Sequence, residues 1–305
     1  MGRKVCDTSP PITIDLIQIM KKRILVTGAT GFIGNYTVPE LLGRGQEVIA
    51  SSSHKAKAIG ASWFKQVQYI PFDLSDFDNS VDYFELFGRP DLMIHLAWEG
   101  LPNYNSSFHL QTNFPRHTAF LKNMVSHGLQ DLTVTGTCFE YGMQEGCLSE
   151  DMAALPKNPY GLAKDALRRA MEEYQSKHPF IFKWIRLFYM FGQGQNPNSL
   201  LSQLDRALDM GEKVFNMSGG QQVRDFLPVE TVAQYIATIG LQQTYQGIIN
   251  CCSGRPVKVE DFVKDYLQLK KAIISLNLGY YPYPSYEPMQ FWGDDHKLNK
   301  MLAEL

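Results

Sequence analysis

The sequence predicts an α/β protein built on a doubly wound parallel sheet, and three observations lead to this class. Short apolar runs rich in β-branched residues alternate with helical patterns between residues 23 and 191. The run at 91–97, DLMIHLA, is nearly all apolar, as a parallel strand covered on both faces must be. A glycine-rich turn directly follows the first run. With 305 residues the chain is also long enough for a second, smaller lobe.

The composition is typical of a globular protein, with 44% hydrophobic and 20% charged residues. The net charge of −2 provides no field that would gather nucleic acid, so we expect no nucleic-acid partner. The 5 cysteines lack the paired spacing of a zinc site, and we expect free thiols and no metal. Residues 1–20 contain only a short apolar run, broken by Asp15 and Gln18. We therefore expect a disordered extension, no membrane anchor and a cytoplasmic location.

Residues 23–34, RILVTGATGFIG, indicate a strand, a tight turn and the start of a helix. Glycines at three-residue spacing let this turn be tight and let its backbone approach a pyrophosphate with no Cβ in the way. The helix N-terminus then offers free N–H groups and a partial positive charge to the anion. The pattern predicts a dinucleotide site, whereas an ordinary glycine-rich turn would keep the fold and lack the ligand. The candidate cofactor contacts in this stretch are Gly28, Thr30, Gly31, Phe32, Ile33 and Gly34.

The second predicted strand, residues 47–51, ends where a doubly wound fold meets the adenosine ribose of its cofactor. An Asp or Glu at this point accepts hydrogen bonds from the ribose of NAD, but residues 51–57 contain no acidic residue. The serine hydroxyls and the cationic side chains present there suit the 2′-phosphate of NADP. We therefore expect Ser52 and Ser53 to contact NADPH, with NAD as the alternative cofactor.

Two further strands are predicted to reach the cofactor from the C-terminal edge of the sheet, where ligands bind in open α/β folds. The third strand, residues 68–72, leads into Asp73 and Leu74, a place suited to the adenine ring. The fourth, residues 91–97, is followed by Trp98. Together with the helical pattern that comes next, these strands add Asp73, Leu74, Leu96, Ala97, Trp98 and Asn113 to the candidate cofactor contacts.

The helix with the clearest predicted start is capped by Asn158. Tyr160 and Lys164 lie four positions apart on this helix and hence on one helix face. A lysine ammonium there is expected to lower the phenol pKa from about 10 towards neutrality, which makes tyrosine a usable general acid or base. Such pairs also occur by chance on helix surfaces. Thr137 follows the fifth strand, where its hydroxyl can bind the substrate oxygen that Tyr160 protonates.

The rest of the chain predicts a second lobe that interleaves with the first, so no clean boundary exists. We expect residues 21–191 to form the cofactor-binding domain, with part of 213–250 returning to it. Residues 192–305 then form most of the substrate lobe. The other predicted elements are helices at 110–127, 159–177, 200–210 and 229–242, strands at 131–136, 180–191 and 248–251, and a short strand near Val214.

Five motifs in order resemble the extended short-chain dehydrogenase/reductase family of nucleotide-sugar epimerases, dehydratases and reductases. They are TGATGFIG, HLA, Thr137 before Tyr141-Gly142, Tyr160-Gly-Leu-Ala-Lys164, and Arg224-Asp225-Phe226. The resemblance runs from about Lys21 to the end of the chain and implies a Rossmann-type fold, a catalytic triad of Thr137, Tyr160 and Lys164, and a homodimer. It also implies that Lys164 holds the nicotinamide ribose. Arg224 resembles the arginine that grips the substrate diphosphate, although a surface salt bridge is the alternative. The candidate substrate contacts are Trp98, Thr137, Tyr189, Gln195, Asn196 and Arg224.

Departures from the family pattern narrow the activity. Dehydratases carry Asp-Glu directly after the catalytic threonine, but Cys138 and Phe139 stand there and Glu140 comes only afterwards. Tyr189 occupies a position that is often a substrate-contacting asparagine. The Cys-Phe-Glu-Tyr-Gly segment and the Phe-Trp-Gly-Asp tail at 291–294 resemble bacterial enzymes of surface-polysaccharide pathways that reduce 4-keto-6-deoxyhexose nucleotides.

The sequence therefore leads to the hypothesis of an NADPH-dependent 4-ketoreductase acting on a nucleotide-linked 4-keto-6-deoxyhexose. The first alternative is an NAD-dependent nucleotide-sugar 4-epimerase, which would use the same three catalytic residues and keep its cofactor bound. The second is a non-catalytic dinucleotide sensor that retains the fold as a binding module.

Overall fold

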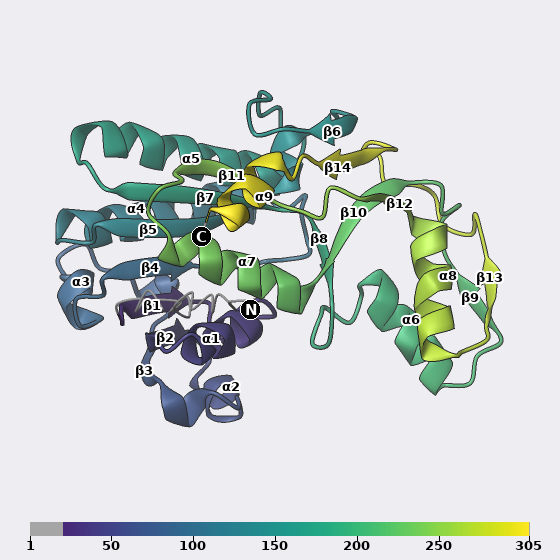
Figure 1. Ribbon diagram of the computed structural model, residues 1–305, viewed down its shortest axis with the longest axis horizontal. Coiled ribbons are helices and arrows are strands. Elements are labelled where there is room, and N and C mark those ends of the chain that lie inside the picture. Colours follow the sequence, from purple (N-terminus) through teal and green to yellow (C-terminus); the bar gives the residue numbers. More distant parts are fainter. Residues whose placement is uncertain (1–20, 305) are drawn as a thin grey trace, which may run out of the picture.

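The computed structural model describes residues 21–304, and its main layer is a seven-stranded parallel sheet (Figure 1). The predicted extension at residues 1–20 lies outside the described residues. The order of strands confirms the doubly wound class, because β1 lies inside the sheet and the chain winds outwards from it in both directions. In spatial order the strands are β11 (Gly247–Cys251), β7 (Ile181–Leu187), β5 (Asp131–Thr137), β4 (Leu92–His95), β1 (Arg23–Thr27), β2 (Glu47–Ser52) and β3 (Gln68–Pro71).

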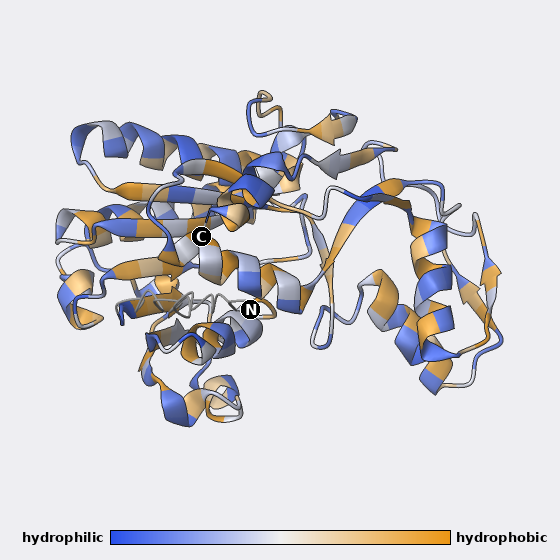
Figure 2. Cartoon of the chain, in the orientation of Figure 1, coloured by the Kyte–Doolittle hydropathy of each residue, from blue (hydrophilic) through white to orange (hydrophobic). Residues whose placement is uncertain are grey.

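Helices cover both faces of this sheet, and alternation along β1 shows why. Ile24 and Val26 point to one face and join the core under α1 (Gly34–Gly43), α7 (Val229–Leu241) and α9 (His296–Ala303). Leu25 points to the other face, under α3 (Tyr83–Leu86), α4 (Phe114–Ser126) and α5 (Pro159–Lys177). Figure 2 shows the resulting pattern, with hydrophobic strands inside and mixed hydropathy along the helices. A short helix, α2 (Lys55–Ile59), follows β2.

The second lobe lies at the right of Figure 1 and has its own apolar core. That core packs α6 (Leu200–Asp209) against α8 (Val259–Lys270), and strands β9 (Val214–Asn216) and β13 (Ser275–Asn277) pair beside them. Two smaller sheets join the lobe to the main sheet. They contain β8 (Tyr189–Phe191), β10 (Val223–Pro228) and β12 (Pro256–Lys258), and β6 (Gly146–Leu148) with β14 (Phe291–Gly293).

Several predicted elements are corrected by the structure. The single strand predicted at 180–191 is two strands, because the chain leaves the main sheet after β7 and β8 pairs with β10 instead. The helix predicted at 110–127 begins with a π-helical turn at His109–Asn113. Four helices, α2, α3, α8 and α9, have no counterpart in the sequence-based prediction. α5 matches its prediction, and the side chain of Asn158 caps it by accepting a hydrogen bond from the Gly161 amide at 2.8 Å.

The described residues contain no helix that is both long and apolar enough to cross a bilayer. The four cysteines in the described part of the chain are free thiols, as expected, and Cys6 lies outside it. No cluster of three potential metal ligands occurs among residues 21–304.

Candidate active site

The glycine turn after β1 forms one wall of the candidate cofactor site. Gly28 has a φ of +70°, and a Cβ there would lie 2.7 Å from the Ala97 amide nitrogen at the end of β4. A Cβ on Gly34 would lie 2.3 Å from the Gly28 carbonyl oxygen. Only glycine fits at both places, and α1 starts with no side-chain cap on its first amides. The turn therefore offers the close backbone approach and free N–H groups that an anionic cofactor needs.

A cavity of about 170 Å³ lies beside this turn at the C-terminal edge of the sheet. Eight of the residues that line it are predicted cofactor contacts: Gly28, Thr30, Gly31, Ser52, Ser53, Leu74, Ala97 and Trp98. The sequence analysis missed the other lining residues, which are Thr27, Ser51, Phe72, Glu99, His117 and Phe120. His117 could have been found from its spacing, because it follows the predicted Asn113 by four positions on α4 and so shares its helix face.

Other predicted cofactor residues do not line this cavity: Phe32, Ile33, Gly34, Asp73, Leu96 and Asn113. Asp73 accepts a hydrogen bond from the Ser75 amide at 2.8 Å and caps the next turn. The Ser75 side chain, followed by this amide, lowers the pKa of the Asp73 carboxyl. Asn113 is buried and donates to the Glu99 carbonyl at 2.9 Å, so it holds the loop after β4 in place. In this structure both side chains serve the local backbone.

The structure brings Thr137, Tyr160 and Lys164 together beside Trp98. Thr137 ends β5, Tyr160 and Lys164 come from the first turns of α5, and all three side chains are buried. The Lys164 ammonium donates to the Thr135 carbonyl at 2.9 Å and lies 3.9 Å from the centre of the Trp98 ring. Lys164 thus contacts the Trp98 ring that lines the cofactor cavity, and the Tyr160 ring lies 6.0 Å from the same ring between centroids.

The charge state of this group differs from the expectation. Burial lowers the pKa of Lys164 from 10.5 to about 7, with Glu140 opposing the shift. Burial, followed by the nearby Tyr104, raises the pKa of Tyr160. The predicted lowering of the phenol pKa by Lys164 is therefore wrong for this structure, because the aromatic surroundings of the phenol outweigh a lysine that is itself partly neutral. Tyr160 is a protonated phenol at neutral pH.

Aromatic side chains enclose the Tyr160 ring, and the sequence analysis missed them. The rings of His109, Tyr104 and Phe139 lie 5.3, 5.6 and 6.2 Å from it between centroids. His109 Nδ1 accepts a hydrogen bond from the Trp98 indole at 3.1 Å, while its Nε2 donates to the Asn103 carbonyl at 2.9 Å. His109 therefore holds the Trp98 ring in place, and it does so as a neutral imidazole. Burial lowers the pKa of His109, in agreement with this neutral state.

Glu140 does not face the candidate active site. Its carboxylate is fully buried and accepts hydrogen bonds from the Thr137 amide at 2.9 Å, the Trp184 indole at 2.9 Å and the Arg186 guanidinium at 2.8 Å. Both carboxylate oxygens of Glu140 are occupied by these hydrogen bonds, so its role is to hold the end of β5 in place. No acid directly follows Thr137 in the sequence, and the first acid that comes is held in this ion pair.

The predicted substrate residues fall into two places. Arg224 and Tyr189 lie on the neighbouring strands β10 and β8, and Arg224 is buried with its guanidinium 2.9 Å from the Glu287 carboxylate. Gln195 and Asn196 lie in the loop after β8, where their side chains bind the local backbone at Met190 and Asn198.

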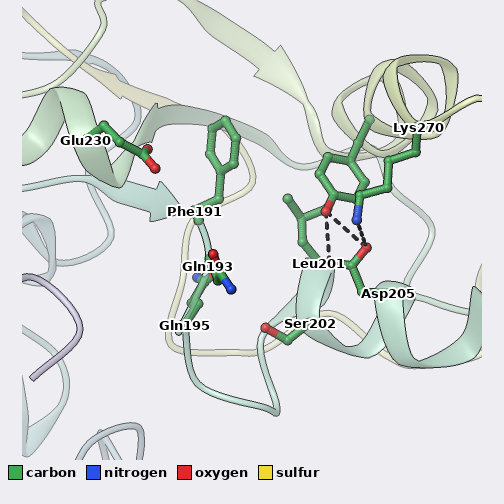
Figure 3. A pocket seen from close by; sticks show the side chains of 10 residues that line it. Phe191, Gln193, Gln195, Leu201, Ser202, Asp205, Glu230 and Lys270 are labelled. Carbon is green, nitrogen blue, oxygen red and sulfur yellow. Dashed lines mark hydrogen bonds and ion pairs between the residues drawn. The ribbon is translucent and has the colours of Figure 1, made fainter. Parts of the chain in front are cut away.

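Gln195 also lines a second cavity of about 520 Å³ between α6, α8 and the start of α7 (Figure 3). Asp205 there accepts hydrogen bonds from Tyr266 and lies 2.8 Å from Lys270, opposite Glu230. None of its lining residues lines the cofactor cavity.

The fold and this arrangement of side chains define an enzyme that uses a nicotinamide dinucleotide. The model of the NAD dependent epimerase/dehydratase family matches residues 24–252, and the chain belongs to this family. The match confirms the resemblance to the extended short-chain dehydrogenases/reductases.

The relatives of this chain include nucleotide-sugar enzymes, and solved structures share its fold. It is 31% identical over 276 residues to dTDP-6-deoxy-L-talose 4-dehydrogenase (NAD(+)) from Aggregatibacter actinomycetemcomitans, covering 88% of this chain and 98% of the relative. It is 26% identical to the UDP-glucose 4-epimerase of Halalkalibacterium halodurans, covering 79% and 78% of the two chains. In structure it is similar to a UDP-glucose-4-epimerase from Stenotrophomonas maltophila with bound NAD, with a TM-score of 0.81, 18% identity and 92% of each chain covered.

Proposed function

We propose that the protein reduces the 4-keto group of a nucleotide-linked 4-keto-6-deoxyhexose with NADPH, as a step in making bacterial surface-polysaccharide sugars. The observation that carries this proposal is the grouping of Thr137, Tyr160 and Lys164 beside the glycine-lined cavity. The dehydrogenase named among the relatives acts at carbon 4 of a deoxysugar nucleotide, and a dehydrogenase is the same reaction run in reverse.

The described residues fit a nicotinamide dinucleotide. The positions at Gly28 and Gly34 leave no room for a Cβ, and we propose that this turn holds the pyrophosphate. Ser52 and Ser53 would meet the adenosine ribose, and Lys164 the nicotinamide ribose. When bound, the cofactor supplies the hydride for carbon 4. NADPH is proposed over NAD because residues 51–57 present no carboxylate to the cavity.

The protonation states suit reduction. Burial keeps Tyr160 protonated, so the phenol can give its proton to the new hydroxyl oxygen at carbon 4. The Thr137 hydroxyl would steady the same oxygen. Lys164, with a pKa of about 7, can hold positive charge beside the phenolate that results and help to restore its proton. A dehydratase is not proposed, because the first acid after Thr137 is buried in the Arg186 ion pair.

Replacing Tyr160 with Phe tests the acid role. We expect turnover of 4-keto-6-deoxy sugar nucleotides to fall at least about 100-fold while cofactor affinity is kept, since only the donated proton is lost. Steady-state kinetics and cofactor titration measure the two effects. Tyr174→Phe is the matched control, because Tyr174 lies on the same helix and stacks on His178 away from the site. A Tyr160→Phe enzyme with most of its activity would refute the assignment.

Identifying the nucleotide that co-purifies, and comparing the affinities for NADPH and NADH, tests the cofactor. A clear preference for NADPH with little bound nucleotide is the expected result. Tightly bound NAD would favour the 4-epimerase, which regenerates its own cofactor. Cofactor binding without oxidation or reduction of any keto sugar would support the non-catalytic sensor.

A further inference from the structure

The segment at 278–290, which we call the strap, connects β13 to β14 and reaches the candidate active site through Tyr286 and Glu287. It is anchored at both ends: the Tyr280 amide donates to the Met217 carbonyl at 3.0 Å, and the Met289 carbonyl accepts from the Val223 amide at 2.9 Å. Between these anchors, residues 282–288 make no backbone-to-backbone hydrogen bond to any other segment of the described structure. The middle of the strap is therefore held mainly by its side chains.

The first of these side-chain contacts is the ion pair between Glu287 and Arg224. The Glu287 carboxylate accepts from Arg224 Nη2 at 2.9 Å, and the two side chains are only 12% and 2% exposed. Arg224 Nη1 is taken up by the Val223 and Met289 carbonyls, at 2.9 and 3.2 Å. The guanidinium also lies over the Phe291 ring, 4.5 Å from its centre. A substrate phosphate that binds Arg224 must compete with a carboxylate already seated there.

The second contact is with two aromatic rings beside the candidate acid Tyr160. The Tyr286 ring lies 6.3 Å from both Tyr104 and Phe139, and these two rings contact Tyr160. Next to Arg224, the buried Tyr189 hydroxyl makes no hydrogen bond in the described structure, although Glu287 is close to it. One short segment thus pairs with the candidate phosphate-binding arginine and packs on the rings next to the candidate acid.

We propose that the strap closes the substrate site in the ligand-free protein, with Glu287 holding the place of a substrate phosphate on Arg224. The inference rests on the proposed function, since it takes a diphosphate as the ligand of Arg224. A diphosphate carries more charge and more acceptor oxygens than a carboxylate, so it can replace Glu287 while Arg224 stays paired. Displacing Glu287 moves Tyr286 away from Tyr104 and Phe139 and opens the path to Tyr160.

Inorganic pyrophosphate, titrated into the full chain by calorimetry, tests the strap. The cofactor site is first saturated with oxidised cofactor, so that the probe does not bind at the glycine turn. We expect Glu287→Gln to bind pyrophosphate about tenfold more tightly than the wild type, because the competing charge is gone. Glu212→Gln is the matched control: it removes the same charge from an exposed site in the same lobe and should bind like the wild type.

A second variant changes the packing of the strap and leaves its charge unchanged. Tyr286→Ala removes the contacts with Tyr104 and Phe139, destabilises the closed arrangement and should also tighten pyrophosphate binding. It tests the proposal even if Glu287→Gln does not fold. If the folded variants bind pyrophosphate with wild-type affinity, the strap proposal is overturned.

Arg224→Met separates this failure from that of the proposed function. If Arg224→Met abolishes pyrophosphate binding and the strap variants bind like the wild type, the strap proposal is wrong and the phosphate-binding role of Arg224 stands. If Arg224→Met binds pyrophosphate normally, the assignment of Arg224 itself is wrong, and the strap proposal falls with it.

Discussion

Lys164 is the residue on which the charge of the candidate site depends. It is buried beside Trp98 and Thr135, with no carboxylate among its hydrogen-bond partners. A pKa of about 7 makes it partly neutral under physiological conditions, unlike a surface lysine. Its ammonium form is therefore available when negative charge develops on Tyr160, and it costs folding free energy when no such charge is present.

This cost predicts a pH-dependent stability. Since the unfolded chain holds the Lys164 proton up to 10.5 and the folded state only to about 7, the folded state binds fewer protons between these values. The free energy of unfolding of the wild type should therefore rise with pH across this window relative to Lys164→Met, by up to about 1.4 kcal/mol per pH unit. Urea unfolding of both proteins at pH 7, 8 and 9 measures the difference. A difference that does not change with pH would contradict the burial argument.

At the scale of elements, the turn between β1 and α1 contributes both to the stability of the fold and to cofactor binding. Gly34→Ala places a Cβ 2.3 Å from the Gly28 carbonyl, so the helix or the turn must shift. We expect a loss of about 1–3 kcal/mol in stability and a clear loss of cofactor affinity. Gly43→Ala, at the other end of α1, meets nothing within 4 Å and should be neutral or slightly stabilising. Thermal unfolding and cofactor titration of both variants check the prediction, and equal effects would contradict it.

Elements fixed by local chemistry could be predicted from the sequence. The glycine turn and the Asn158 cap need only neighbouring residues, and both occur where expected. The break between β7 and β8 could not be predicted, because residues 180–191 are apolar except for Lys183 and Arg186 and only the pairing with β10 divides them. The same holds for the ion pair of Arg224 and Glu287, whose partners lie 63 residues apart and meet only through the folded strap.

At the scale of the whole molecule, the main sheet is completed by a late part of the chain. β11 pairs with β7, and α7 adds Ile236 and Ile239 to the core on one face. A fragment ending at Phe191 lacks both elements and exposes that core. We expect it to be insoluble or to lack cooperative thermal unfolding, as measured by circular dichroism and size-exclusion chromatography. A monomeric fragment that unfolds cooperatively would show that the first lobe is an independent domain.

The chain crosses between the lobes from β7 through β8 to α6, from β10 to α7, from β11 through β12 to α8, and from β13 through β14 to α9. Several covalent crossings limit how far the two lobes can separate, because a hinge motion must bend every crossing segment together. We expect the admission of a bulky ligand to depend more on short surface loops, such as the strap, than on a large separation of the lobes. Loop exchange at the strap is accordingly the change that should alter which sugars enter while leaving the frame of the molecule intact.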